Sequence, residues 1–175
     1  MYIETDNASR HTVSVLVSNE PGVLARVSGL FSRRGFNIDS LAVGTTQDPE
    51  VSRITLVVRG NDAIIEQLVQ QLYKLICVQK VQVMQPRNAV ERQLLLVKVS
   101  ASVAEREGLM RLVDIFKAKV LDVTRTSMTL QITGDNDKIS SMLSLLEDYG
   151  ILELVRTGMI ALERGDAVMN SDIFD

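Results

Sequence analysis

The chain shows two successive runs of the same alternation between strand-like and helix-like hydrophobic patterns. In the first run, residues 11–17 are rich in β-branched side chains and mostly alternate, which predicts a strand with one face buried more deeply than the other. Apolar residues then recur at helical spacing from residue 23 to residue 31. These patterns predict a strand, a tight turn and an amphipathic helix.

The turn before this helix carries the first candidate chemistry. Pro21 suits the first helical turn because its missing N–H would have no partner within the helix. Gly22 has no side chain, and we expect the amides of Gly22 and Val23 to be free because first-turn donors have no intrahelical acceptors. A small carboxylate could bind there. At the far end, Gly35 suits the left-handed residue that closes many helices.

The same run continues with a hairpin, a second helix and a last strand. Turn-forming residues at 44–50 separate the hairpin strands, and Asp62 suits the N-cap of an amphipathic helix that reaches Ile76. The remaining strands are predicted at residues 37–43, 51–58 and 78–84. The order strand–helix–strand–strand–helix–strand predicts an α+β, ferredoxin-like domain with two helices on one face of a four-stranded antiparallel sheet.

A polar, proline-containing segment at 85–92 breaks the periodicity and is interpreted as a linker, after which the pattern begins again. Strands are expected at 94–100, 120–124, 128–133 and 151–155, with helices at 105–117 and from Asp135 to just before Gly150. The predicted organisation is therefore two tandem ferredoxin-like domains, residues 1–84 and 93–163. Residues 164–175 lack clear periodicity and are expected to form a flexible tail.

Composition narrows the class of protein. The 175 residues are 46% hydrophobic and 23% charged, with a net charge of -3, and no basic stripe with interleaved aromatics indicates nucleic-acid binding. No apolar run approaches the roughly 18 residues of a membrane span. Residues 1–6 are acidic and polar where a targeting peptide would be basic, so we expect a cytoplasmic protein without a membrane or nucleic-acid partner.

No residue set indicates catalysis or metal binding. The sequence spacing places no nucleophile or carboxylate beside His11. Cys77 is interpreted as an unreactive residue packed in the core. One cysteine and one histidine leave neither an internal disulfide nor a His/Cys metal cluster. Two acidic pairs stand at predicted helix starts, where capping explains them: Glu105 with Glu107, and Asp135 with Asp137.

Arg33 and Arg34 leave a second interpretation open. A phosphate could bind this pair, although compensation of the negative helix end explains both residues without a ligand.

The motifs around the first helix resemble those of a known family. The string Asn-Glu-Pro-Gly-Val-Leu at 19–24, followed by Gly-Leu-Phe-Ser-Arg-Arg-Gly-Phe-Asn-Ile-Asp-Ser-Leu-Ala-Val at 29–43, closely resembles the amino-terminal ACT domain of the small, regulatory subunit of acetohydroxyacid synthase (acetolactate synthase). An isolated Asn-x-Pro-Gly would be weak evidence because many turns contain it. Similar segments occur at 52–56, 65–68, 71–76, 91–99 and 115–116, so the resemblance covers about residues 10 to 165.

This resemblance implies a non-catalytic regulatory subunit. In that family the small subunit activates a large catalytic subunit and makes it sensitive to feedback inhibition by a branched-chain amino acid. Valine is the first candidate here, and leucine and isoleucine stay open. The large subunit holds thiamine diphosphate, magnesium and FAD, so no cofactor is expected on this chain.

The resemblance also implies an effector site at the first turn. The expected effector-binding residues are Asn19, Gly22, Val23, Leu24, Asn37 and Ile38. Because the first two strands run parallel, Asn19 and Asn37 should lie at opposite ends of one sheet, about 20 Å apart. We therefore expect a homodimer through the ACT domains, in which the edge strands pair and each site draws on both chains. The second domain has Ser-Val-Ala-Glu-Arg-Glu-Gly at 102–108 in place of this motif.

A second class of function stays open at this point. The chain could be a free-standing amino-acid sensor that acts on another enzyme or on a transcription factor. The sequence shows no DNA-binding helix pair, which counts against direct regulation of transcription.

Overall fold

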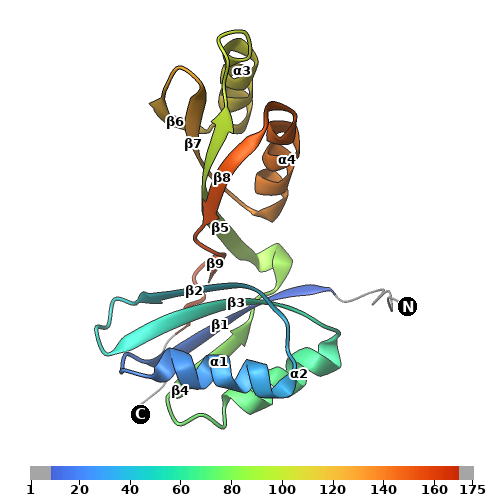
Figure 1. Cartoon of the computed structure of the whole chain (residues 1–175). Helices are drawn as coiled ribbons and strands as arrows, with labels where there is room; N and C mark the ends of the chain where they lie inside the picture. Colours follow the sequence, from blue (N-terminus) through green and yellow to red (C-terminus); the bar gives the residue numbers. More distant parts are fainter. Residues whose placement is uncertain (1–8, 170–175) are drawn as a thin grey trace. The chain divides into compact units, whose positions relative to one another are not determined.

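The computed structural model describes residues 9–169 of the chain. These residues divide into two units (Figure 1): residues 9–90 together with 159–169 form the first, and Glu91–Gly158 form the second. The expectations for residues 1–8 and 170–175 lie outside the described residues.

The first unit has the predicted order of elements. They are β1 (Arg10–Ser18), α1 (Val23–Arg34), β2 (Ile38–Thr45), β3 (Val51–Arg59), α2 (Asp62–Leu72) and β4 (Val78–Val83). The sheet order is β2-β3-β1-β4 with antiparallel neighbours, as the ferredoxin-like topology requires. Both helices cover one face of this sheet (Figure 1). The predicted fold of this unit is confirmed.

Alternation along the strands places the core between sheet and helices. Val13, Val15 and Val17 point to the helices because successive strand residues face opposite sides. They pack with Val27 and Phe31 of α1, which recur at helical spacing. Further buried members of this cluster are Leu30, Ile54, Leu56, Val58, Ile65, Leu68, Leu72 and Cys77.

The second helix is shorter than predicted and begins one residue earlier. Its N-cap is Asn61, whose side chain accepts from the Ile64 N–H, so the assignment of the cap to Asp62 is wrong. The helix ends at Leu72, and Ile76 is fully exposed, so Ile76 is not a core residue of the helix. No glycine or proline marks this end in the sequence, and the apolar spacing simply continues into the following turn.

The other face of the first sheet is covered by chain from the C-terminal region. Strand β9 (Ile160–Glu163) pairs with β5 (Ala89–Ser100), and the Arg164 N–H donates to the Asn88 carbonyl over 2.6 Å. Figure 1 shows β9 on the side of the sheet opposite α1 and α2. The Met159 N–H donates to Ser40 Oγ over 2.8 Å. Two small apolar clusters lie under this segment: Leu16 with Val51 and Met169, and Met84 with Ala89 and Ala161.

This coverage changes two boundaries predicted from the sequence. Residues 159–163 were expected in the second domain but belong to the first unit. Met169 is only 8% exposed, so the segment 164–169 is not a free tail. The expected linker instead contains a short 3₁₀ helix, Pro86–Asn88, and the first residues of β5. Pairing between residues far apart in sequence produces no local periodicity, so the pattern could not reveal this return.

The second unit repeats the topology with the sheet order β6-β7-β5-β8. Besides β5, its elements are α3 (Arg106–Phe116), β6 (Lys119–Val123), β7 (Ser127–Gly134), α4 (Asn136–Leu146), a 3₁₀ turn (Glu147–Tyr149) and β8 (Ile151–Arg156). Its separate core includes Leu95, Val97, Leu130, Ile139 and Met142, all buried. The chain therefore has two ferredoxin-like units, each with its own hydrophobic core, as predicted.

Candidate functional site

The loop between β1 and α1 is held by three backbone hydrogen bonds. The Ser18 N–H donates to the Cys77 carbonyl over 2.9 Å, and the Asn19 N–H donates to the Glu50 carbonyl over 2.7 Å. The Glu20 N–H donates to the Ser18 carbonyl over 3.0 Å. The loop is thus fixed to the chain entering β3 and to the chain entering β4, which sets where α1 begins.

The Asn19 side chain also contacts the β2–β3 loop. Its Nδ2 donates to the Pro49 carbonyl over 2.8 Å, and its Oδ1 accepts from Ser52 Oγ over 3.1 Å. An amide group has two N–H donors and two acceptor lone pairs, so one of each remains for a ligand. Sequence reasoning missed Pro49 and Ser52, since nothing in the local pattern links them to residue 19.

Gly22 provides the open space at the start of α1. Its φ of 84° is left-handed, which favours glycine, and a Cβ there would meet nothing within 4 Å. The N–H groups of Gly22, Leu24 and Ala25 have no hydrogen-bond acceptor among residues 9–169. The expectation of a free amide at Val23 is wrong, because this N–H makes a long, 3.4 Å bond to the Glu20 carbonyl. Three open donors therefore remain at the positive end of the helix dipole.

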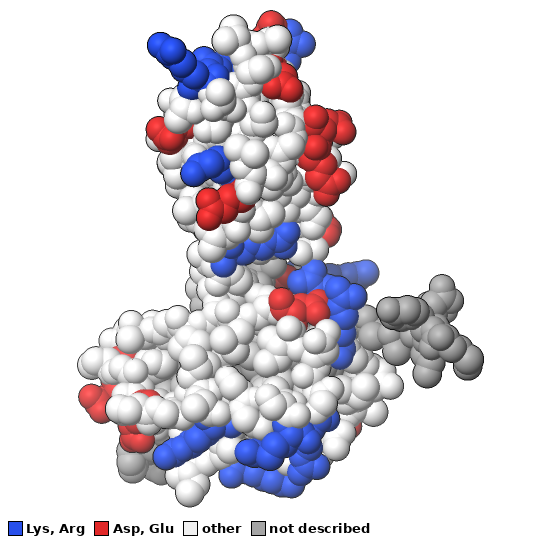
Figure 2. Space-filling view, viewed as in Figure 1, with Lys and Arg blue, Asp and Glu red and all other residues white. Residues whose placement is uncertain are grey.

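No acidic side chain of α1 opposes an anion at this end, and Arg26 lies near it, whereas Arg33 and Arg34 lie in the last turn at the other end. The helix contains three arginines and no acidic residue. Figure 2 shows Lys and Arg side chains gathered over α1 on the visible face. Among the apolar site residues, Val23 is buried in the core whereas Leu24 is 44% exposed. Of these two residues, Leu24 offers apolar surface to a ligand, and Val23 positions the helix start.

Asn37 and Ile38 lie at the opposite end of the sheet. Ile38 pairs with Val58 of β3, whereas Ser18, next to Asn19, pairs with Val51. The two β3 partners, Val51 and Val58, are seven residues apart, which corresponds to about 24 Å at the usual rise per residue of a strand. Asn37 is exposed and Ile38 packs partly against the core. One chain therefore does not bring the six predicted residues together.

Strand β2 is an edge of the sheet, and among the described strands it pairs only with β3. Its Asp39 carboxylate accepts from Arg59 Nε over 2.7 Å and lies 3.5 Å from Arg10 Nε. This ion pair, which the sequence analysis did not single out, anchors the start of β2 beside Asn37. The predicted geometry, with an open edge and with Asn19 and Asn37 at opposite ends, is thus present in the single chain.

The equivalent turn of the second unit contains a carboxylate that bonds to the residue three positions before it and caps no N–H of α3. Glu105 accepts from the Ser102 N–H over 2.8 Å and from Ser102 Oγ over 2.5 Å. These two hydrogen bonds, the hydroxyl one foremost, lower the pKa of Glu105. The capping interpretation of Asp135 is confirmed, since its side chain accepts from the Lys138 N–H. For Glu105 it is wrong, because the Glu105 side chain accepts from no N–H of α3.

The remaining candidates show no arrangement for chemistry. His11 Nε2 lies 2.7 Å from Ser9 Oγ and 3.1 Å from the Gly60 carbonyl, and Cys77 is buried in the first core. Across the described residues, no cluster of three or more His, Cys, Asp or Glu could hold a metal ion. Nor does any described helix have the length and apolarity to cross a membrane.

Comparison with known proteins identifies the family to which this fold belongs. Residues 13–80 match the model of the AHAS small subunit-like ACT domain, so the first unit is an ACT domain. Residues 92–165 match the model of the small subunit of acetolactate synthase.

Individual relatives agree along nearly the whole chain. A probable acetolactate synthase small subunit from Archaeoglobus fulgidus is 50% identical over 157 residues, which is 90% of this chain and 98% of the relative. The acetolactate synthase small subunit of Mycolicibacterium smegmatis is 48% identical, covering 89% of this chain and 91% of the relative. The crystal structure of the acetolactate synthase small subunit from Thermotoga maritima aligns with a TM-score of 0.84 at 41% sequence identity. The alignment covers 91% of this chain and 99% of the Thermotoga chain.

The chain belongs to the acetolactate synthase small-subunit family. Its class is that of regulatory, non-catalytic subunits, as predicted, because in this family catalysis lies on the large subunit.

Proposed function

We propose that this chain binds and activates the acetolactate synthase catalytic subunit in the cytoplasm and makes it sensitive to feedback inhibition by a branched-chain amino acid, valine first. The observation that carries the effector role is the start of α1, where Gly22 leaves space and three N–H groups lack acceptors among the described residues. Such a helix start binds a carboxylate through its donors and dipole. An α-amino acid supplies that carboxylate.

The complete site forms between two copies of the chain. Antiparallel pairing of β2 with β2 of a second copy would bring Asn37 of that copy to the end of the sheet where Asn19 lies. The ligand carboxylate then binds the N–H groups of Gly22 and Leu24. The Asn37 amide of the second copy accepts from the ligand ammonium.

Apolar contacts select a branched side chain in this arrangement. Leu24 exposes nearly half of its surface beside the open donors, and Ile38 of the second copy flanks Asn37. Each methyl group buried between them favours binding by about 0.8 kcal/mol, so valine, leucine and isoleucine bind more tightly than alanine.

Reconstitution with the catalytic subunit tests the regulatory role. The catalytic subunit, loaded with thiamine diphosphate, magnesium and FAD, is assayed alone and with this chain, each with and without valine. We expect activation by the chain and inhibition by valine only when the chain is present. Failure to activate or to co-purify would contradict the role and favour the alternative, a free-standing sensor of another target.

Mixing two damaged chains tests the shared site. Asn19→Ala and Asn37→Ala each damage both sites of a homodimer, but a mixed dimer contains one intact and one doubly damaged site. Calorimetry should show valine binding restored to about half of the sites. A mixture that has exchanged subunits, shown by mass spectrometry, and binds no better than either parent would contradict the shared site.

A further inference from the structure

The edge strand β2 contains a β-bulge at Asp39. Ile38 pairs with Val58 of β3, whereas Ser40 pairs with Val57, so β2 advances by two residues while β3 advances by one. The extra residue is Asp39. Its side chain is 16% exposed although the residue as a whole is exposed, so the bulge leaves mainly the Asp39 backbone open at the edge. Bulges often lie beside functional sites, where they change the direction of a side chain.

The bulge decides which side chains of β2 face the helices. Ile38 and Leu41 both pack against the first core, although they are three residues apart. In a regular strand, residues three apart face opposite sides of the sheet, so only one of the two could reach this core. The extra residue removes the conflict. Asn37 directly precedes Ile38, so the bulge also sets the side of the sheet to which Asn37 points.

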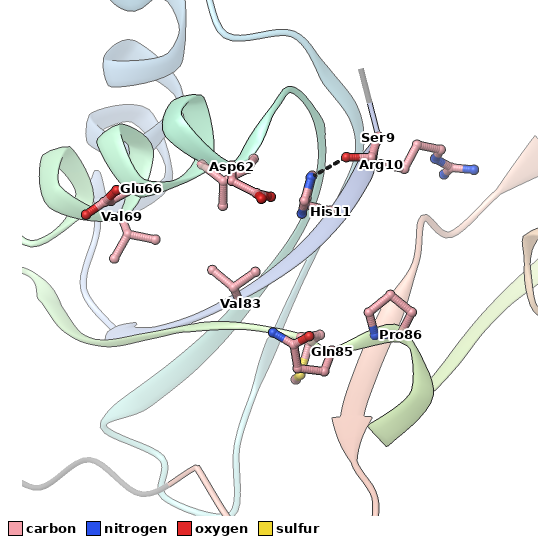
Figure 3. A pocket seen from close by; sticks show the side chains of 11 residues that line it. Ser9, Arg10, His11, Asp62, Glu66, Val69, Val83, Gln85 and Pro86 are labelled. Atoms are coloured by element: carbon pink, nitrogen blue, oxygen red, sulfur yellow. Dashed lines mark hydrogen bonds between the residues drawn. The ribbon is translucent and has the colours of Figure 1, made fainter. Parts of the chain in front are cut away.

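Two arginines hold the carboxylate of Asp39. Arg59 Nε donates to Asp39 Oδ2 over 2.7 Å, and Arg10 Nε lies 3.5 Å from the same oxygen. Figure 3 shows the Arg10 side chain directed away from the cavity that Ser9 and His11 line beside it. Arg10 and Arg59 are direct partners across β1 and β3. Like charges at such positions repel each other, and the shared carboxylate offsets this repulsion.

The Asn37 side chain has no such anchor. It is exposed and forms no hydrogen bond with residues 9–169, so only the backbone on either side positions it. On one side, the Phe36 N–H donates to the Phe31 carbonyl at the end of α1 over 3.2 Å. On the other side stand the bulge and the ion pairs of Asp39. The direction of Asn37 therefore depends on Asp39.

We propose that Asp39 is a positioning residue of the effector site. Held by the two arginines, it fixes the bulge, and the bulge directs Asn37 and Ile38 toward the amino acid at α1 of a second copy. Asp39 thus acts on the site of the other chain without contact to the ligand. This inference rests on the proposed function, in which each site draws Asn37 from the second copy.

Asp39→Asn tests the role of the charge with almost no change of size. Valine affinity of the full chain, measured by calorimetry, should fall at least about tenfold, because a misdirected Asn37 loses its hydrogen bond from the ligand ammonium. Arg59→Gln removes the 2.7 Å donor and should have the same effect, so the test does not depend on the folding of one variant. Circular dichroism and sedimentation check that each variant is folded and dimeric.

A charge-matched control comes from the same unit. Asp62→Asn removes an equal charge at a residue of α2 that forms no ion pair within the described part of the chain. It should leave valine affinity unchanged. Equal affinity of the Asp39→Asn and Asp62→Asn variants would overturn the inference.

Mixed dimers separate positioning from general damage to the chain. An Asp39→Asn chain paired with an Asn19→Ala chain contains one site with both asparagines present and correctly placed, so binding should return to about half of the sites. Paired with an Asn37→Ala chain, it contains no such site, and binding should stay weak.

The mixture of Asn19→Ala with Asn37→Ala is the reference. If the reference regains binding, restoration of Asp39→Asn by both partners or by neither overturns the positioning role alone. Failure of the reference, with subunit exchange shown by mass spectrometry, overturns the proposed shared site and this inference with it.

Discussion

The two turns that lead from the first strand of each unit into its first helix share a place in the fold but differ in chemistry. In the first unit, Gly22 leaves space and N–H donors without acceptors. In the second unit, the Glu105 carboxylate accepts from Ser102 within the same turn. The second turn thus holds a carboxylate of its own, although Glu105 caps no N–H of α3, whereas the first turn of α1 has no acidic residue. The two units thus share one topology, and the local residues of each turn decide whether a ligand site exists.

A second contrast concerns chain continuity. The second unit is one uninterrupted stretch, Glu91–Gly158, whereas the first is completed by residues from beyond it. Residues 159–169 bury apolar side chains on the outer face of the first sheet, among them Leu16 and Val51. The two units should therefore respond differently to cutting the chain.

The largest expected effect comes from truncation. A chain that ends at Val90 loses the residues that cover Leu16, Val51 and Met84. The exposure of these side chains should lower the free energy of unfolding of the first unit by about 4–6 kcal/mol, which is a large part of a small domain's stability. Residues 91–158 alone should melt cooperatively in calorimetry. As a control, residues 91–158 are replaced by a flexible Gly/Ser linker, which should restore cooperative melting of the first unit. Equal stability of the truncated and linked variants would show that the C-terminal segment contributes nothing.

The next effect concerns the open turn. Gly22→Asp should lower valine affinity at least about tenfold, because its carboxylate competes for the helix start and repels the ligand. Gly22→Asn is the matched control: it has nearly the same size, no charge, and similar tolerance of a positive φ. Calorimetry measures binding, and circular dichroism checks the fold. Equal valine affinity of the two variants would contradict a carboxylate site at Gly22.

Removal of equivalent helix caps should have equal, smaller effects in the two units. Asn61→Ala and Asp135→Ala each remove the acceptor of one N–H, of Ile64 and Lys138 respectively. Each should cost about 1 kcal/mol, or roughly 4–8 °C in the melting temperature of its own unit. Asn136→Ala, next to a cap but with no hydrogen bond from its side chain, is the control. An equally large shift for this control would refute the capping explanation.

The smallest effect concerns the occupied turn and depends on pH. The pKa of Glu105 is lowered in the folded chain, so its ionised form stabilises the fold above the unfolded pKa, and this contribution disappears as pH falls through the folded pKa. Glu105→Gln should therefore lower the melting temperature of the second unit at neutral pH and have no effect in acid. Glu147→Gln, at an exposed acid of the same unit, is the control. A pH-independent shift would indicate a packing effect instead.

Local patterns predicted the elements well because each unit is built from short-range periodicities. The alternation in residues 11–17 and the helical spacing from Val23 to Phe31 both reflect one buried face, which the structure shows. The two failures around α2 are also local: neither Asn61 as cap nor the end at Leu72 could be separated from near-equivalent neighbours. Element boundaries depend on small free-energy differences that periodicity does not contain.

The missed features of the site are non-local. Asn19 was predicted as a ligand-binding residue, yet its contacts to Pro49 and Ser52 depend on the β1–β3 register. The return of residues 159–169 likewise depends on pairing between distant segments. Only Gly22 could be assigned from its own position, because the start of a helix has open donors whatever the tertiary structure.

The discontinuity of the first unit has a consequence for synthesis on the ribosome. Strand β9 is translated after the entire second unit, so the outer face of the first sheet stays uncovered in the nascent chain. At roughly 5–20 residues per second, this interval lasts on the order of several seconds. The second unit can finish folding within it. The part of the chain that is made first is therefore completed last, and a nascent chain is exposed to aggregation through its uncovered apolar side chains until residues 159–169 have emerged.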